Sequence, residues 1–269
     1  LSSSAPVCFC AMPHAGPVTA AAFSGDGKSL ATVSRDGTVR VWDVPDAPAG
    51  SSRLQLFVSD SRIFPDGKRI FAFDYSVGAR LLELPSGASG AGPLVPGAPG
   101  KPRHLQFQGL DKAGKRFVGL LRDGDHEAWV FDAADGKRLA GPFSFGAGKE
   151  LQFARLSPDG ARLLLSATQE GLALFDIASG KKLDSLGGLG FVHDAAFSPD
   201  GRLLAVSGMD TSQRDYSKGL FSSGNHTEIR DASKLERVVV EVKHGGGTVL
   251  WSEDGRRLAT ADDQERTVR

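Results

Sequence analysis

One six-residue turn element recurs along the 269-residue chain, and its spacing limits what the chain can fold into. The copies read FSGDGK at 23–28, IFPDGK at 63–68, LDKAGK at 110–115, LSPDGA at 156–161, FSPDGR at 197–202 and WSEDGR at 251–256. Successive copies begin 40, 47, 46, 41 and 54 residues apart. A repeat of this length is one supersecondary unit that cannot bury its own faces, so the copies must stack to form a core. The chain is therefore expected to be a repeat protein of six units.

The repeat is best preserved at residues 14–44, HAGPVTAAAFSGDGKSLATVSRDGTVRVWDV. Three runs of β-prone residues, at 18–23, 29–34 and 38–44, are separated by the turn sequences Gly-Asp-Gly and Arg-Asp-Gly. This pattern predicts a three-stranded antiparallel meander. A candidate outer strand precedes each meander, at 7–12, 53–56, 92–95, 138–143, 181–186 and 236–242. The sequence thus predicts an all-β fold of four-stranded units.

The outer strand expected at 92–95 has the poorest sequence for a strand. Prolines stand at positions 93, 96, 99 and 102, and a proline cannot donate a hydrogen bond to a neighbouring strand. We expect this strand to be frayed or absent.

The residues of the first repeat resemble the WD-repeat family. The resemblance rests on the pair Trp42-Asp43, on His14 upstream and on the Asp-Gly turn at 36–37. In the later repeats the tryptophan position is occupied by Leu82, Phe131, Phe175 and Arg230, so only the first repeat keeps its tryptophan. The resemblance implies a β-propeller of about six four-stranded antiparallel blades, in a single domain over residues 1–269. We expect this domain to be part of a longer protein.

The ends of the chain bear on how such a propeller would close. The sequence RTVR at 266–269 matches GTVR at 37–40 and stops just before the expected Trp-Asp pair. The strand at 7–12 is therefore expected to pair with 267–269 and close a six-bladed ring through the termini. The alternative is an open arc cut from a larger propeller.

The family resemblance also implies a buried hydrogen-bond chain from Trp42 through Ser34 and His14 to Asp36. An indole N–H can only donate and a carboxylate can only accept, whereas hydroxyl and imidazole groups relay between them, so the series can be satisfied. A Ser/His/Asp catalytic set would need an exposed pocket and an oxyanion donor that the meander does not supply. We therefore expect these four residues to hold the fold rather than to catalyse a reaction.

We expect the chain to act as a non-catalytic scaffold that binds a protein or peptide on one face of the propeller, the channel face. The resemblance implies that this face carries the loops entering each inner strand and those joining the second and third strands. The longest such loop is the insertion at 208–225. We expect it to contact the partner, because loops can vary in sequence while the scaffold keeps its fold. The candidate binding residues are Met12, Arg35, Asp60, Asp123, Gln169, Asp210, Arg214, Asp215, Tyr216, Lys218 and Phe221.

Composition narrows the function classes further. Lysine plus arginine equals aspartate plus glutamate at 32 each, which removes any bulk electrostatic case for a nucleic-acid partner. No apolar run approaches the length of a membrane span, so membrane insertion is not expected. The two cysteines, Cys8 and Cys10, are expected to be reduced thiols, which favours a cytoplasmic location. The glycine- and alanine-rich style resembles bacterial propellers attached to larger signalling or envelope proteins, so we expect a monomeric domain within a larger chain.

An enzymatic or cofactor-binding propeller is the alternative. The segments FDAADGKRL at 131–139 and FDIASGKKL at 175–183 are similar to repeats of quinone-dependent dehydrogenases, but the tryptophan that follows the Gly-Lys turn in that family is absent. The six histidines fall at different registers of their repeats, whereas a centre on the propeller axis needs several at equivalent positions. We expect no cofactor, no metal and no enzymatic activity.

Overall fold

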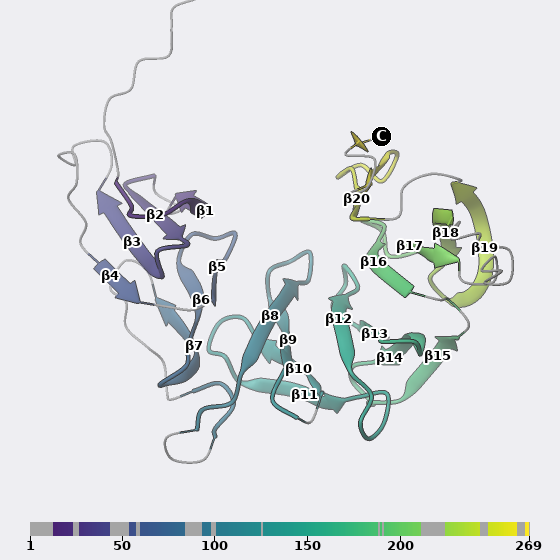
Figure 1. Cartoon of the computed structure of the whole chain (residues 1–269), viewed down its shortest axis with the longest axis horizontal. Helices are drawn as coiled ribbons and strands as arrows, with labels where there is room; N and C mark the ends of the chain where they lie inside the picture. The colour runs from purple at the N-terminus through teal and green to yellow at the C-terminus, as the bar shows by residue number, and fades with distance from the viewer. Residues whose placement is uncertain are drawn as a thin grey trace, which may run out of the picture. The chain divides into compact units, whose positions relative to one another are not determined.

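The structure, a computed structural model, describes residues 13–23, 27–43, 54–57, 60–83, 93–97, 101–124, 126–187, 189, 191–210, 224–242, 247–262 and 267–268. Within these residues the chain forms antiparallel β-sheets and no helix (Figure 1). The chain divides into two compact units, residues 1–107 and 108–269, and each is described by itself. The all-β fold predicted from the turn repeat is confirmed.

The N-terminal unit holds the first two sheets. The first, in the order β1-β2-β3-β4, consists of β1 (Val18–Phe23), β2 (Ser29–Ser34), β3 (Thr38–Asp43) and β4 (Leu54–Phe57). The second, in the order β5-β6-β7, consists of β5 (Asp60–Ile63), β6 (Arg69–Asp74) and β7 (Gly78–Glu83). The predicted meander of the first repeat is confirmed, and the outer strand predicted at 53–56 is found at Leu54–Phe57, where it pairs with the third strand of this meander.

The second sheet has three strands in the described part of the chain. Prolines explain why residues 93–97 do not form the fourth. Residues 93–97 form no strand, and one backbone hydrogen bond, from Leu94 N to Ala79 O at 2.8 Å, stands where an outer strand would pair with β7. The expected loss of this outer strand is confirmed for residues 93–97. Its cause is that Pro93 and Pro96 have no N–H to donate to a neighbouring strand.

The C-terminal unit holds the remaining four sheets. The division after Phe107 falls within β8, the first strand of the third sheet. The third sheet contains β8 (Leu105–Leu110), β9 (Arg116–Leu121), β10 (Ala128–Asp132) and β11 (Arg138–Phe143). The fourth contains β12 (Leu151–Leu156), β13 (Arg162–Ala167), β14 (Gly171–Asp176) and β15 (Lys182–Leu186). The fifth contains β16 (Phe191–Phe197), β17 (Leu203–Asp210), β18 (Gly224–Asp231) and β19 (Lys234–Val242). The sixth contains β20 (Val249–Trp251), β21 (Leu258–Asp262) and β22 (Thr267–Val268).

Strand register shows that the sheets are copies of one unit. Trp42 lies opposite Leu30, and the residues aligned with Trp42 from sequence lie opposite the matching residue of their own second strand: Leu82 opposite Ile70, Phe131 opposite Phe117, Phe175 opposite Leu163 and Arg230 opposite Leu204. The sequence alignment of the repeats is therefore correct at these positions.

Backbone conformation explains why glycine recurs in the turn element. Gly27, Gly67, Gly114, Gly160, Gly201 and Gly255 all adopt φ between 63° and 72°. A side chain with a Cβ atom is strained in this left-handed region, whereas glycine enters it without cost. The six-fold recurrence in sequence is thus the recurrence of one tight turn between the first and second strands.

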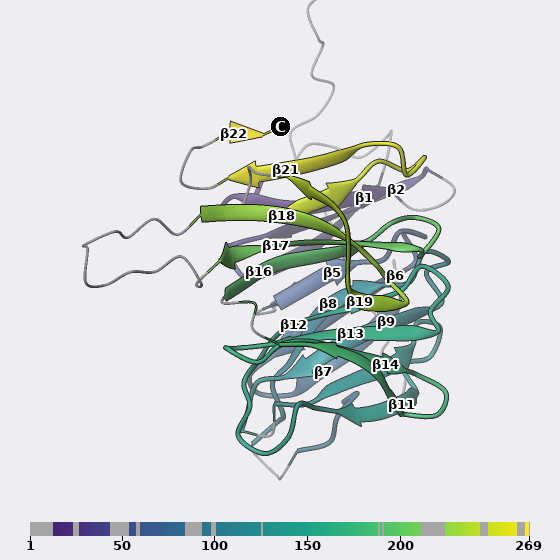
Figure 2. The same ribbon diagram turned by 90° about the vertical axis from the view of Figure 1, so that its right-hand side faces the viewer.

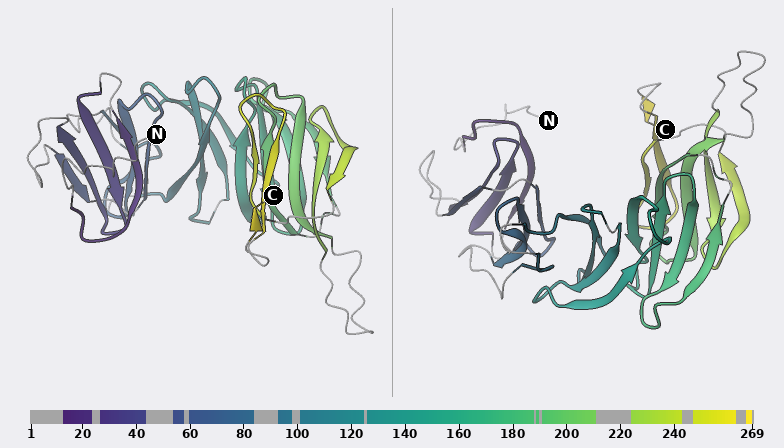
Figure 3. Two further views of the ribbon diagram at one scale, coloured as in Figure 1. Left: turned by 90° about the horizontal axis from the view of Figure 1, so that it is seen from above. Right: turned by 60° about the horizontal axis from the view of Figure 1, so that its bottom comes forward.

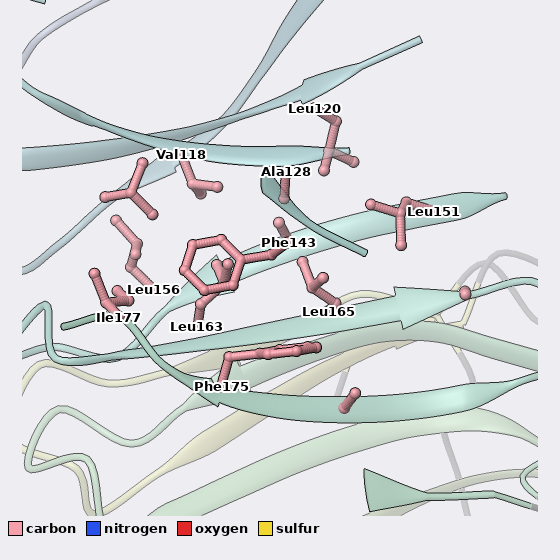
Figure 4. Packing of buried hydrophobic residues seen from close by; sticks show 14 residues of the cluster. Val118, Leu120, Ala128, Phe143, Leu151, Leu156, Leu163, Leu165, Phe175 and Ile177 are labelled. Carbon is pink, nitrogen blue, oxygen red and sulfur yellow. The ribbon is translucent and has the colours of Figure 1, made fainter. Parts of the chain in front are cut away.

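Apolar side chains fill the space between neighbouring sheets. The second strands are buried on both faces, so they read as continuous apolar runs rather than as an alternation. In the C-terminal unit one cluster joins the third and fourth sheets, and Figure 4 shows Phe143 and Phe175 among the leucines of β12 and β13. A second cluster, around Leu164, Leu174 and Leu204, joins the fourth and fifth sheets. In the N-terminal unit Val33, Ile70 and Leu82 belong to a smaller cluster of the same kind.

Arginines at the start of second strands bind the turn of the next sheet in the C-terminal unit. Arg116 Nη1 donates to the Gly160 carbonyl. In the same way Arg162 donates from Nη2 to Gly201 O at 2.6 Å and from Nη1 to Ala232 O at 2.7 Å. These charged hydrogen bonds are directional, unlike the apolar clusters, so they fix how adjacent sheets align.

We expect Arg162→Met to lower the free energy of unfolding by about 1–2 kcal/mol, because two carbonyls lose a charged donor while the apolar stem is kept. Chemical denaturation monitored by circular dichroism measures the change. Arg202→Met is the matched control, since Arg202 precedes the second strand of the fifth sheet and is exposed. Equal effects of the two substitutions would contradict the role assigned to Arg162.

Candidate interaction face and the polar network of the first sheet

A hydrogen-bonded network crosses the first sheet beside Trp42, which is fully buried. Trp42 Nε1 donates to Thr32 Oγ1 at 2.8 Å, and His14 Nε2 lies 2.7 Å from the same oxygen. The other ring nitrogen of His14, Nδ1, lies 3.3 Å from Asp36 Oδ2 and 3.1 Å from Thr38 Oγ1. Because indole can only donate, the Thr32 hydroxyl is assigned as donor to His14 Nε2, and His14 Nδ1–H as donor to Asp36.

The predicted link through Ser34 is wrong, because Thr32 bridges Trp42 and His14. Ser34 Oγ instead donates to Gly16 O at 2.9 Å and accepts from Asp36 N at 3.2 Å. The strand register gives the reason. Thr32 is two residues from Leu30, the residue opposite Trp42, whereas Ser34 is four residues away, about 13 Å along a strand. That distance exceeds the reach of the indole.

Asp36 anchors the far end of this network. Its Oδ1 accepts from the Thr38 hydroxyl at 2.6 Å and from Thr38 N at 2.9 Å, and its Oδ2 accepts from Ala15 N at 2.8 Å. These donors, the Thr38 hydroxyl first, hold the pKa of Asp36 well below its usual range. Asp36 is therefore a carboxylate that ties the segment before β1 to the turn between β2 and β3.

The expected interaction face is represented by the turns between second and third strands. Arg35, Asp123 and Gln169 are exposed, and each lies within two residues of the end of the second strand of its own sheet. Gln169 adopts φ of 62°, a region that a side chain other than glycine rarely enters. These three predicted residues are thus solvent-facing turn residues, although Arg35 directly follows its second strand whereas Asp123 and Gln169 stand one residue further on.

The second sheet presents an exposed residue, at the position of Arg35, that sequence reasoning missed. Tyr75 follows the end of β6 directly and is 67% exposed, more than any other aromatic side chain in the described ranges. The alignment that found Arg35 would have found Tyr75, since both come directly after the second strand of their repeats. Tyr75 therefore completes a series of four exposed turn residues.

The remaining predicted face residues are only partly described. Asp60 is the first residue of β5 and Asp210 the last of β17, and nothing further is described for their side chains. The other candidates lie outside the described residues: Met12, Arg214, Asp215, Tyr216, Lys218 and Phe221. Cys8 and Cys10 also lie outside the described residues. The same holds for the whole strand predicted at 7–12, on which the predicted ring closure depends.

The insertion lies between the second and third strands of the fifth sheet, as expected, but its predicted bounds of 208–225 are wrong, because Gly208–Asp210 and Gly224–Asn225 are paired strand residues of β17 and β18. β17 and β18 are eight residues long, two more than β13 and β14, and they pair without interruption up to Asp210 and Gly224 (Figure 2). β19, drawn in yellow-green in Figure 3, is the outer edge strand of this sheet and pairs with β18. The insertion therefore starts from a hairpin longer than its counterpart in the fourth sheet.

Histidines and acidic residues do not gather into one centre in the portion that the structure describes. His14 belongs to the network of the first sheet, His104 precedes β8, His126 lies in the β9–β10 turn, and His193 and His226 lie in β16 and β18. His244 lies outside the described residues. Among the described side chains no three from His, Cys, Asp and Glu are arranged to hold a metal ion. The same residues contain no helix long and apolar enough to cross a membrane.

Comparison with known proteins agrees with this architecture. The WD domain, G-beta repeat family matches residues 7–43 and 180–212. An uncharacterized WD repeat-containing protein of Deinococcus radiodurans is 30% identical over 196 residues, which cover 63% of this chain and 74% of that protein. The target of rapamycin complex subunit wat1 of Schizosaccharomyces pombe is 41% identical over 73 residues, which cover 26% of this chain and 23% of that subunit.

A solved structure supports the fold alone. The crystal structure of the computationally designed Ika8 protein aligns with 97% of this chain and 73% of its own, with a TM-score of 0.64 and 16% sequence identity.

Sheet order, register and the repeated turn define an all-β repeat protein built from copies of one antiparallel sheet. The coverage and identity of the Deinococcus relative then show the family. The chain belongs to the WD-repeat family.

Proposed function

We propose that this chain is a non-catalytic scaffold that binds a protein or peptide through the turns between second and third strands. One observation carries the proposal. In each of four successive sheets an exposed side chain stands one or two residues after the end of the second strand, and its type changes from sheet to sheet: Arg35, Tyr75, Asp123 and Gln169. Turns at one place in the repeat that present a different side chain in each sheet suit recognition of a protein or peptide, because loops vary while the sheets hold.

The polar network beside Trp42 supports a structural role for His14 and Asp36. A nucleophile and its base need an accessible position for a reacting atom. Trp42 is fully buried, and the donors and acceptors of the network satisfy one another. The relative from Schizosaccharomyces is a subunit of a complex, which agrees with partner binding as a general role. Its alignment covers a quarter of this chain, so we carry over nothing about that complex.

Site-specific photo-crosslinking tests the proposed face. Benzoylphenylalanine is introduced singly in place of Arg35, Asp123 or Gln169, and in the control proteins in place of Leu139 or Leu183. The two leucines are about half exposed and lie on the outer strands β11 and β15. After irradiation in extract of the native host, we expect defined higher-mass adducts from the turn positions and few from the outer strands. Adducts of equal yield from both sets would refute the proposed face.

A further inference from the structure

The outer strand of the fifth sheet, β19, pairs with its neighbour along only part of its length. Seven of its nine residues are exposed, and its three consecutive valines, at 238–240, are exposed by 43–48%. Five of the nine residues have a partner residue on β18: Lys234, Val238, Val240, Glu241 and Val242. In the fourth sheet, by comparison, four of the five residues of β15 have a partner on β14. β19 is therefore a long edge strand whose pairing is interrupted.

The one buried residue of β19, Leu235, anchors the strand. Its side chain belongs to the apolar cluster between the fourth and fifth sheets. Its N–H donates to Asp184 Oδ2 of β15 at 2.7 Å, and its carbonyl accepts from Arg230 Nη1 of β18 at 2.6 Å. Side chains thus bind the backbone of Leu235, which has no partner residue on β18. We call these three residues, Asp184, Arg230 and Leu235, the latch.

The charge of Arg230 is compensated inside the fifth sheet. Arg230 is 6% exposed, and its Nε donates to Glu228 Oε2 at 2.7 Å. A guanidinium bonded to a carboxylate in this way has a fixed orientation, which directs Nη1 at the Leu235 carbonyl. Arg230 occupies the position of Trp42 in the first sheet. Whereas Trp42 is bonded through Thr32 to His14, before β1, Arg230 is bonded to the outer strand of its own sheet.

The burial of β19 contrasts with that of β17 in the same sheet. In β17 the residues from Leu204 to Ser207 are all buried, whereas β19 buries the Leu235 side chain alone. A segment with few buried apolar contacts and exposed backbone hydrogen bonds opens at a lower free-energy cost than the whole domain. The cost of separating β19 from β18 therefore lies mainly in the latch and in the short paired stretch at 240–242.

From this arrangement we propose that β19 is a strap that opens from β18 as one unit while β16, β17 and β18 stay paired, and that the latch sets how often it opens. Opening uncovers the edge of β18, and the backbone donors and acceptors of an uncovered edge can pair with an added strand. The strap goes beyond the proposed function and does not depend on it, because the turns between second and third strands are not part of β19.

Hydrogen exchange of the full chain, followed by mass spectrometry under native conditions, tests the strap. We expect the amides of 236–242 to exchange at least about tenfold faster than those of β17, after correction for their intrinsic rates, because the strap opens without unfolding the rest of the sheet. Equal protection of 236–242 and β17 would overturn the proposal.

Variants of the latch then show what controls the opening. Asp184→Ala removes one acceptor, and Arg230→Lys keeps a cation beside Glu228 but loses the planar fork that also reaches Leu235. Each should speed exchange at 236–242 by about a further tenfold and leave β17 unchanged, since one hydrogen bond to a charged group is lost. Ser185→Ala is the matched control, because it changes an exposed side chain next to Asp184 on β15.

Two outcomes with these variants would contradict the role of the latch. One is an unchanged exchange rate at 236–242 in Asp184→Ala. The other is an equal rise of the rate at 236–242 and at β17, which would report a loss of stability of the whole sheet. Crosslinking at Arg35, Asp123 and Gln169 is measured separately, so the strap and the proposed interaction face can fail independently.

Discussion

Replacing Trp42 by alanine should lower the free energy of unfolding by about 3–5 kcal/mol, the range found when a buried tryptophan or phenylalanine is truncated. Trp42 has no exposed surface, and its indole N–H is one end of the network through Thr32 and His14. Urea denaturation followed by circular dichroism measures the loss.

Trp42→Phe separates packing from hydrogen bonding. It keeps most of the ring volume and removes the donor, so we expect a loss of about 1–3 kcal/mol. Thr32→Val should cost a similar amount, and the double variant should cost less than the sum of the two, because both remove the same hydrogen bond. Ser34→Ala is the control outside the link from Trp42 to His14. A full additive loss in the double variant would show that Trp42 and Thr32 do not act together.

Acid should unfold the protein over a narrow range below pH 5, because turn aspartates recur with the repeat. In the turns of the fourth, fifth and sixth sheets a serine hydroxyl donates to an aspartate: Ser157 to Asp159, Ser198 to Asp200 and Ser252 to Asp254. These hydroxyls, followed by backbone N–H groups, lower the pKa of each aspartate. Asp36 is shifted in the same direction by Thr38.

The sign of the effect follows from linkage. A carboxylate with a lower pKa in the folded state binds fewer protons there than in the unfolded chain, so stability rises with pH through this window. The contribution is complete above the unfolded value of about 3.9 and is lost as pH falls through the lower folded value. We expect the urea midpoint to be constant from pH 7 to 5 and to fall steeply below pH 4. Asp159→Asn, Asp200→Asn and Asp254→Asn combined should flatten this fall, and an unchanged slope would contradict the assignment.

The repeat architecture could be predicted from sequence because its physical cause is local. A turn that needs φ near 65° admits glycine and little else, so Gly160 and Gly201 mark their turns without reference to the rest of the fold. Proline acts in the same local way at 93 and 96, which is why the missing strand of the second sheet could be expected.

The details of the site were harder to predict because they depend on strand register. Ser34 and Thr32 are both hydroxyl residues on one face of β2, and only the pairing of Leu30 with Trp42 decides which of them the indole can reach. Tyr75 was missed for another reason. Its exposure and its contacts with the rings of Phe73 and His104 are properties of the folded chain. His104 is separated from Tyr75 by β7 and a proline-containing segment, so no local sequence pattern links the two rings.

The long hairpin of β17 and β18 has a practical consequence for engineering. Its two extra residues per strand, compared with β13 and β14, extend the paired segment by about 7 Å beyond the length of that hairpin. The apolar cluster around Leu204 lies at the other end of β17, so an added sequence at 211–223 would be separated from it by paired backbone. This hairpin is therefore the natural attachment point for a fluorescent reporter or an affinity tag that leaves the stacked sheets intact.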